Sequence, residues 1–205
     1  MIRTFVAVEL DPVLRHAIGR LQDQLKDRVQ HELLKSPHAR LQWVRPESIH
    51  LTLKFLGDVE EARVETICRT MAEAIGALPP LTLIVQGVGA FPTLRAPRVL
   101  WLGVSSDPGQ AQVNALTHLA GTVDQALHRL GFPLESRPFS PHFTLARIKE
   151  RPHEIGKALN DCQVMTHTSP LGTLIVRTIA LIKSELTPSG SRYTRLCELP
   201  LSVRP

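Results

Sequence analysis

The sequence predicts an α+β fold in which two halves of similar design each carry an antiparallel sheet with helices on its outer side. The first observation is a pattern, Ser-X-His-X-Thr-Leu, that occurs at residues 48–53 and again at residues 140–145. The second is the order of the segments, because each copy lies in a strand-like run that comes after a helical one. The third is that no linker, low-complexity tract or heptad repeat divides the 205 residues. We therefore expect one bilobal domain over residues 1–205, with two sheets lining a central cleft.

The first half of the chain is expected to contain three extended segments and two helices. Strands are predicted at residues 3–10, 41–44 and 49–56, and helices at residues 12–31 and 60–78. Asp11 and Pro12 are typical of a helix N-terminus, because an Asp side chain caps the first turn and Pro suits the first helical position. The second helix has apolar residues at helical spacing and ends at Pro79.

The second half repeats this order and adds a C-terminal hairpin. Strands are predicted at residues 81–88, 98–104, 142–148, 172–186 and 193–199, and a helix from Asp107 to about Leu130. Turn-rich residues 89–97 separate the first two strands, and a short helix with loops is expected within residues 149–170. Turn chemistry at residues 187–190 joins the last two strands.

The two motif strands each present an imidazole beside a hydroxyl. Residues two apart in a strand point to the same face. His50 and Thr52 would therefore share one face, and Leu51, Leu53 and Phe55 the other. His142 and Thr144 would stand opposite Phe143 and Leu145 in the same way.

Two such strands brought together could cleave a phosphoester without a metal ion. One imidazole would donate a proton and the other accept one, while the two hydroxyls hold the phosphate. A histidine in a strand can equally be a structural residue, and Thr is a good strand former. The matched setting of both copies is what favours function over this simpler interpretation.

Composition sets limits on the class of protein. Lys and Arg number 24 against 19 Asp and Glu, a net charge of +5 that suits an anionic partner, but only 4% of residues are aromatic, and no dense basic run occurs. No run of about eighteen apolar residues is present, so we expect no membrane segment. The three cysteines, Cys68, Cys162 and Cys197, are odd in number and lack metal-type spacing, which argues against a disulfide framework and for the cytoplasm.

The motifs, taken with further segments, resemble the two-histidine (2H) phosphoesterase superfamily and, within it, the RNA 2',3'-cyclic phosphodiesterases once named 2'-5' RNA ligases. The resemblance spans nearly the whole chain, at residues 4–8, 48–57, 97–101, 137–147, 183–190 and 193–194. It implies a bilobal fold with pseudo-twofold symmetry, hydrolysis of a 2',3'-cyclic phosphate to a 2'-phosphomonoester, and no metal or other cofactor.

The resemblance also assigns roles to individual residues. It implies that His50 is the proton donor and His142 the proton acceptor, with Thr52 and Thr144 on the non-bridging phosphate oxygens. The residues alone do not order the two histidines, because the motifs are nearly interchangeable. Arg147 matches a family arginine near the phosphate, but strict alternation puts it on the face away from His142, so a bulge or strand end is needed to bring it round.

The expected partner is RNA or a nucleotide ending in a 2',3'-cyclic phosphate, bound by a monomer, with weak reverse ligation of a 2'-5' bond also chemically feasible. Further candidates for RNA contact near the motifs are Trp43, Arg45, Lys54 and Arg137. Two alternatives stay open at this point. One is a metal-dependent phosphohydrolase, although no ligand motif appears, and the other is a non-catalytic module that binds RNA or nucleotides.

Overall fold

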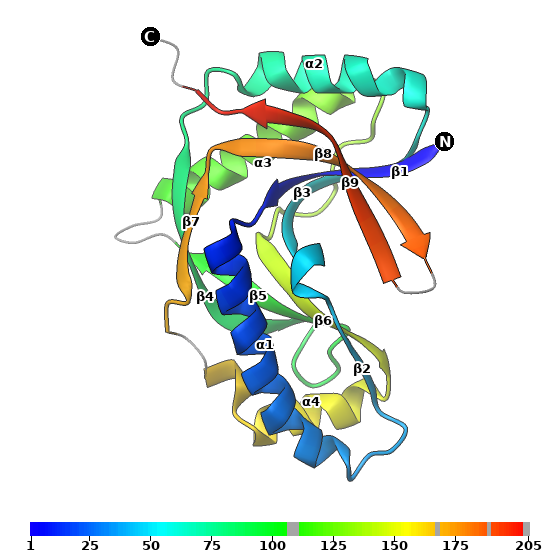
Figure 1. Ribbon diagram of the computed structural model, residues 1–205, viewed down its shortest axis with the longest axis vertical. Coiled ribbons are helices and arrows are strands. Elements are labelled where there is room, and N and C mark those ends of the chain that lie inside the picture. The colour runs from blue at the N-terminus through cyan, green and yellow to red at the C-terminus, as the bar shows by residue number, and fades with distance from the viewer. Residues whose placement is uncertain (106–110, 167–168, 188–189, 203–205) are drawn as a thin grey trace.

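The computed structural model describes residues 1–105, 111–166, 169–187 and 190–202, which form two lobes (Figure 1). The first lobe, lower in Figure 1, holds β2 (Arg40–Trp43), β4 (Leu81–Phe91), β5 (Val99–Ser105), β6 (His142–Glu150), β7 (Gly172–Val176), α1 (Pro12–Leu33) and α4 (Pro152–Asp161). The second lobe holds β1 (Ile2–Glu9), β3 (His50–Val59), β8 (Thr178–Thr187), β9 (Gly190–Pro200), α2 (Val64–Ile75) and α3 (Ala111–His128). Short 3-10 helices lie in the connections at residues 46–48, 61–63 and 164–166.

The strands of the two lobes belong to one antiparallel sheet. Within the described residues the strand order is β7-β4-β5-β6-β3-β1-β8-β9, and β2 pairs with β6. The lobes join where β3 meets β6, through the pairing of Leu51 with Phe143. The predicted bilobal α+β architecture is confirmed, and the two motif strands form its junction.

Four strands of each lobe correspond in order, with β2 as an addition to the first lobe, but neither lobe is built from one half of the sequence. Reading outward from the junction, β6, β5, β4 and β7 match β3, β1, β8 and β9. The first half of the chain gives β2 to the lobe of β5 and β6, and the second half gives β8 to the lobe of β1 and β3. This exchange interleaves the two lobes along the chain.

Helices α1, α2, α3 and α4 contribute to one hydrophobic core on one face of the sheet. This core contains, for example, Ile18 of α1, Met71 of α2, Leu119 of α3 and Leu159 of α4. As expected, α1 begins after Asp11, whose side chain accepts a hydrogen bond from the backbone N–H of Leu14 at 2.9 Å.

The opposite face of the sheet, which we call the open face, carries a small apolar cluster of its own. The cluster consists of Phe5, Ala7, Ala180 and Ile182, with Tyr193 packed against it. The motif histidines and threonines lie on this face as well, because Leu51, Leu53, Phe143 and Leu145 between them belong to the helix-covered core. The side chains of the motif histidines and threonines are thus separated from the main core by the sheet itself.

Three expectations need correction. Residues 172–186 form two strands in different lobes, β7 paired with β4 and β8 paired with β1, because the chain passes from one lobe to the other between Val176 and Thr178. Strand β4 continues to Phe91, through part of the segment expected to be turn-rich.

Cys68 of α2 and Cys197 of β9 form a disulfide, since α2 packs on β9 and brings together residues 129 positions apart. The predicted helix start at residues 107–109 lies outside the described residues.

Candidate active site

The strand register gathers the four motif side chains into one patch on the open face. Leu51 pairs with Phe143 across antiparallel strands, so continuing the register places His50 opposite Thr144 and Thr52 opposite His142. Directly opposite residues in such a ladder have Cα atoms about 4.5–5.5 Å apart. By this register each imidazole has the hydroxyl of the other motif as its cross-strand neighbour, so that one anion can contact both rings.

Both histidines are fixed in the same way by the serine two residues earlier. The Nδ1 atom of His50 lies 3.0 Å from the carbonyl oxygen of Ser48, and Nδ1 of His142 lies 2.7 Å from the carbonyl oxygen of Ser140. A carbonyl oxygen can only accept, so Nδ1 carries the hydrogen in each ring and Nε2 is left for chemistry. A neutral ring in this tautomer can take a proton at Nε2, and a protonated ring can give one.

Aromatic rings surround His50. Phe5 of β1 stacks on the imidazole with centroids 4.5 Å apart and planes at 26°, and Tyr193 of β9 meets it edge-on at 5.2 Å. The pKa of His50 is lowered to about 4, mainly by burial; the hydrogen bond to Ser48 opposes this shift, and the charges of Arg147 and His142 add to it. The free protein therefore keeps His50 neutral at pH 7. Sequence reasoning missed the contact with Tyr193, which depends on strands distant in the chain.

His142 has a different aromatic neighbour. Phe91 of β4 meets its ring edge-on, with centroids 5.1 Å apart and planes at 83°, and Phe91 in turn packs on Trp101. The indole of Trp101 lies against Gly89, where an added Cβ would come within 2.1 Å of the ring. Glycine at position 89 therefore makes room for the ring of Trp101, the residue that pairs with Thr144 across the strands.

A β-bulge follows each motif and turns the fifth residue after the histidine onto the open face. In β6, Thr144 pairs with Trp101 and Ala146 with Leu100, so Leu145 is the extra residue. Both Leu145 and Ala146 are consequently buried, and Arg147 is exposed on the side of His142 and Thr144. The bulge that Arg147 would require is present, and its charge acts on His50.

The matching bulge in β3 corrects the expected position of Phe55. Ala7 pairs with Thr52 and Val6 with Lys54, so Leu53 is the extra residue. Lys54 is therefore buried, whereas Phe55 is 60% exposed and packs against Phe5 on the open face. The expectation that Phe55 lies opposite His50 is wrong, because alternation fails at the bulge. Phe55 and Arg147 occupy equivalent positions in the two lobes.

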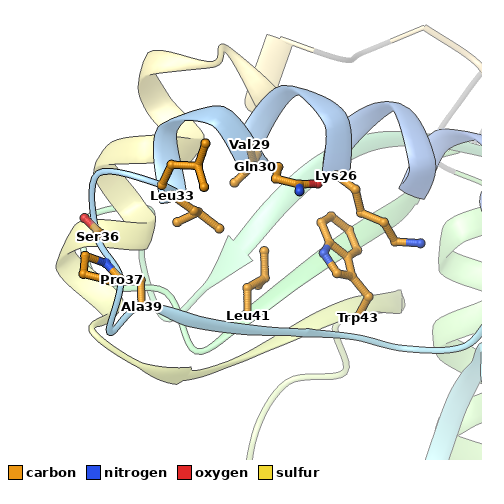
Figure 2. Close-up of a pocket in the computed structure, with 10 residues that line it drawn as sticks. Lys26, Val29, Gln30, Leu33, Ser36, Pro37, Ala39, Leu41 and Trp43 are labelled. Carbon is orange, nitrogen blue, oxygen red and sulfur yellow. The ribbon is translucent and has the colours of Figure 1, made fainter.

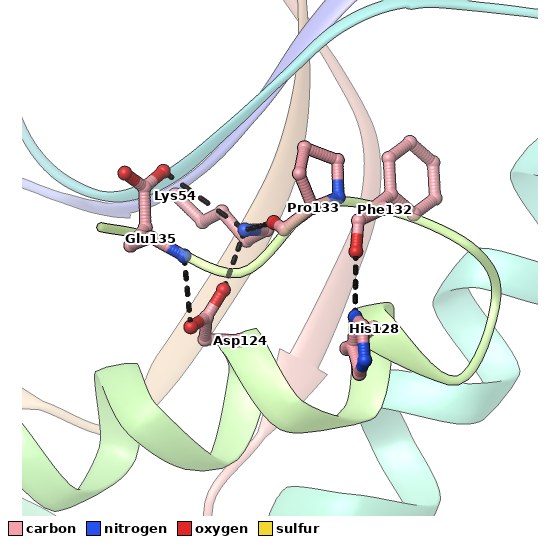
Figure 3. A network of polar contacts seen from close by, with 6 residues as sticks. All are labelled: Lys54, Asp124, His128, Phe132, Pro133 and Glu135. Carbon is pink, nitrogen blue, oxygen red and sulfur yellow. Dashed lines mark hydrogen bonds and ion pairs between the residues drawn. The ribbon is translucent and has the colours of Figure 1, made fainter.

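Lys54 is a structural residue rather than an RNA contact. Its ammonium group donates to Asp124 of α3 at 2.5 Å and to the carbonyl oxygen of Pro133 at 2.7 Å (Figure 3). The second oxygen of Asp124 accepts from the backbone N–H of Glu135 at 3.2 Å. This network connects the first motif strand to α3 and to the segment that leads toward the second motif.

A groove of about 480 Å³ lies away from the motif residues (Figure 2). It runs between the last turns of α1 and β2, with Leu41 and Trp43 on its strand side and Val29 and Leu33 on its helix side. Gln42, between Leu41 and Trp43, is the cross-strand partner of Arg147 and so faces the other way. The Trp43 side chain thus belongs to the helix-covered side of the sheet and not to the open face.

Among the described residues no cluster of three or more His, Cys, Asp or Glu side chains is arranged to hold a metal ion. The same part of the chain contains no helix that is long and apolar enough to cross a membrane.

Comparison with known proteins identifies the family. A family model described as LigT-like phosphoesterase matches residues 11–101 and 107–193. The chain belongs to this family. It is 32% identical over 195 residues to the RNA 2',3'-cyclic phosphodiesterase of Methanothermobacter thermautotrophicus, covering 94% of this chain and 95% of the relative. The enzyme of the same name from Aquifex aeolicus is 34% identical over 185 residues, covering 89% and 94%.

Solved structures of LigT-like phosphoesterases share this fold over nearly the full chain. The Thermus thermophilus protein TT0787 superposes with a TM-score of 0.71 at 25% identity, covering 98% of both chains. Escherichia coli LigT in complex with 3'-AMP superposes with a TM-score of 0.64 at 26% identity, again covering 98% of both.

Proposed function

We propose that this protein hydrolyses RNA 2',3'-cyclic phosphate ends to 2'-phosphomonoesters, acting as a monomer with residues 1–205 as one catalytic unit in the cytoplasm. The register that joins the two motif strands carries the proposal. It aligns two imidazoles with identically anchored Nδ1 atoms, each beside a hydroxyl of the other motif. The printed names of the curated relatives support the same substrate class.

The reaction requires one proton to leave water and another to reach the departing oxygen. As water attacks phosphorus, Nε2 of His142 accepts its proton and a new P–O bond forms. The bond from phosphorus to the 3'-oxygen breaks, and Nε2 of His50 gives that oxygen a proton. Each transfer contributes about 10²- to 10⁴-fold. The hydroxyls of Thr52 and Thr144 donate to the non-bridging oxygens and stabilise the charge that builds up there.

To act as a proton donor, His50 must be protonated when substrate is bound, so substrate binding must raise its pKa. In the free protein burial holds the pKa of His50 at about 4. A phosphate anion placed between the two rings favours the charged imidazole and raises this pKa. His50 would thus become protonated only when the phosphate of a bound substrate lies beside it.

The two residues that follow the bulges supply an asymmetry to an otherwise symmetric site. Arg147 offers a guanidinium group that can bind a phosphate oxygen. Phe55 offers a 60% exposed ring, which is a surface on which a nucleobase can stack. The pair would give the bound nucleotide a direction and so determine which ester oxygen faces His50.

The decisive experiment uses an oligonucleotide that ends in a 2',3'-cyclic phosphate, with EDTA present throughout. We expect the wild type to yield a 2'-phosphate, and His50→Ala and His142→Ala each to lose at least about 100-fold in turnover. His118→Ala, at an exposed position on α3, is the matched control and should retain full activity.

Each contrary result has a distinct meaning. Binding of the oligonucleotide without turnover by the wild type would indicate the non-catalytic module. Turnover that is absent in EDTA and appears when a divalent ion is added in excess of the chelator would indicate the metal-dependent alternative. Product carrying a 3'-phosphate would reverse the orientation proposed here. Ligation of 2'-5' ends in concentrated RNA would follow from the same transition state with a hydroxyl in place of water.

A further inference from the structure

Gln22 is a fully buried polar residue on α1 that the reaction does not use. Its side chain has 0% exposure in a helix face that is otherwise apolar where it meets the core. An uncharged polar group in such a place is retained at a cost unless its hydrogen bonds are made. The amide nitrogen of Gln22 makes its hydrogen bonds, whereas the buried Oε1 has no hydrogen-bond partner among the described residues. The acceptors of Nε2 therefore indicate what the residue does.

Both N–H groups of the Gln22 amide are directed at the backbone beside the second motif. Nε2 donates to the carbonyl oxygen of Leu145 at 2.9 Å and to that of Val44 at 2.8 Å. The backbone N–H of Val44 also donates to the Leu145 carbonyl at 2.9 Å. Leu145 is the extra residue of the β6 bulge. Gln22 thus fastens the bulge to the helix behind it and to the end of β2.

The position of Arg147 depends on this bulge. Without the extra residue, Arg147 would follow strict alternation from Thr144 and point into the helix-covered core. The β3 bulge has a comparable anchor, because Lys54, the residue after Leu53, is held by Asp124 of α3. Each motif is therefore followed by a bulge that a polar side chain from a packed helix helps to hold.

We propose that Gln22 is a positioning residue, which fixes the bulge at Leu145 and thereby keeps Arg147 on the open face in reach of the substrate. The inference builds on the proposed function, because it takes Arg147 as part of the binding site. Removing the amide donors should weaken substrate binding through Arg147. The proton transfers at His50 and His142 should be affected much less, because their Nδ1 anchors to Ser48 and Ser140 do not involve Gln22.

The test is a double-mutant cycle of Gln22→Met with Arg147→Ala on the cyclic-phosphate oligonucleotide. Met keeps the length and approximate volume of the side chain but cannot donate. Losing a charged hydrogen bond to the substrate should raise KM about ten- to hundredfold in Arg147→Ala. We expect Gln22→Met to raise KM about tenfold with the pH profile of kcat unchanged, and to add less than about twofold in the Arg147→Ala background.

Val29→Ala, another buried α1 position, controls for loss of helix packing and should leave KM as in the wild type. The NMR chemical shifts of the backbone amides of residues 144–147 should differ from the wild type in Gln22→Met and should equal the wild-type values in Val29→Ala. Gln22→Asn, which keeps the amide but falls one carbon short, replaces the Met variant if that variant does not fold.

Equal KM losses from Gln22→Met in both backgrounds, or none in either, would overturn the positioning role. No KM effect of Arg147→Ala would instead remove Arg147 from the binding site, and the inference with it. An inactive wild type would refute the proposed function, while the amide shifts would still report whether Gln22 holds the bulge.

Discussion

His50 stacks face to face on Phe5, with ring centroids 4.5 Å apart and ring planes at 26°. Phe5 itself is 3% exposed and belongs to the apolar cluster of the open face. His50 therefore packs against a hydrophobic surface, and burial is the main reason that its pKa falls to about 4. The consequences of this contact can be measured both with and without substrate.

Titration of the His50 ring by NMR should give a pKa near 4 in the free protein and a higher value when a 2'-nucleotide monophosphate is bound. The reason is that the phosphate anion stabilises the imidazolium against the burial that disfavours it. His50→Gln identifies the resonance. A pKa that stays near 4 in the complex would be inconsistent with His50 as the proton donor.

The same shift makes stability depend on pH. The pKa of His50 is lower in the folded chain than the value of 6.5 for an ordinary histidine, so the unfolded chain takes up this proton first as pH falls. The contribution of His50 to the free energy of unfolding is fully present above pH 6.5 and is lost as pH falls toward 4. From pH 7 to pH 5 the loss should be about 2 kcal/mol. Urea unfolding at both pH values measures this loss. The free energy of unfolding should fall less between pH 7 and pH 5 in His50→Gln than in the wild type. An equal fall in both proteins would contradict a buried, neutral His50.

Much of the fold and the four motif positions follow from local sequence. The two-residue period holds from His50 to Leu53 and from His142 to Leu145, so the face shared by each His and Thr could be predicted. The resemblance added the expectation that both faces meet in one site. Helix α1 was predictable from its cap and apolar spacing because both are properties of neighbouring residues.

The features that were not predictable depend on pairing between distant strands. The bulges arise where β3 meets β1 and β6 meets β5, so nothing local indicates that Phe55 leaves the core face or that Arg147 lies on the open face. The split between β7 and β8, the contact of Tyr193 with His50 and the Cys68–Cys197 disulfide have the same origin. Each of these features depends on residues that only the folded structure brings together.

Lys54→Met should destabilise the protein by about 3–5 kcal/mol, because it leaves Asp124 without the cation that it faces in a largely dry site. Lys54→Met with Asp124→Leu should recover part of this loss, since two apolar groups can replace a buried ion pair. Lys35→Met removes a surface pair with Glu32 and should cost at most about 1 kcal/mol. Urea denaturation measures the free energy of unfolding of all three variants. If Lys54→Met lost no more of this free energy than the Lys35→Met control, the network in Figure 3 would not support the fold.

The Cys68–Cys197 disulfide closes a loop of 129 residues and so restricts the unfolded chain. Chain-entropy arguments give about 5 kcal/mol for a loop of this length, and measured values are typically about 2–4 kcal/mol. A reducing agent should therefore lower the urea midpoint of the wild type. The double variant Cys68→Ala/Cys197→Ala should match the reduced protein and respond no further to reductant. Cys162→Ala, at the free thiol, should keep the full response. An unchanged midpoint on reduction, with free thiols counted to confirm that the bond was present and then broken, would show that packing of α2 on β9 holds this part of the fold without the disulfide.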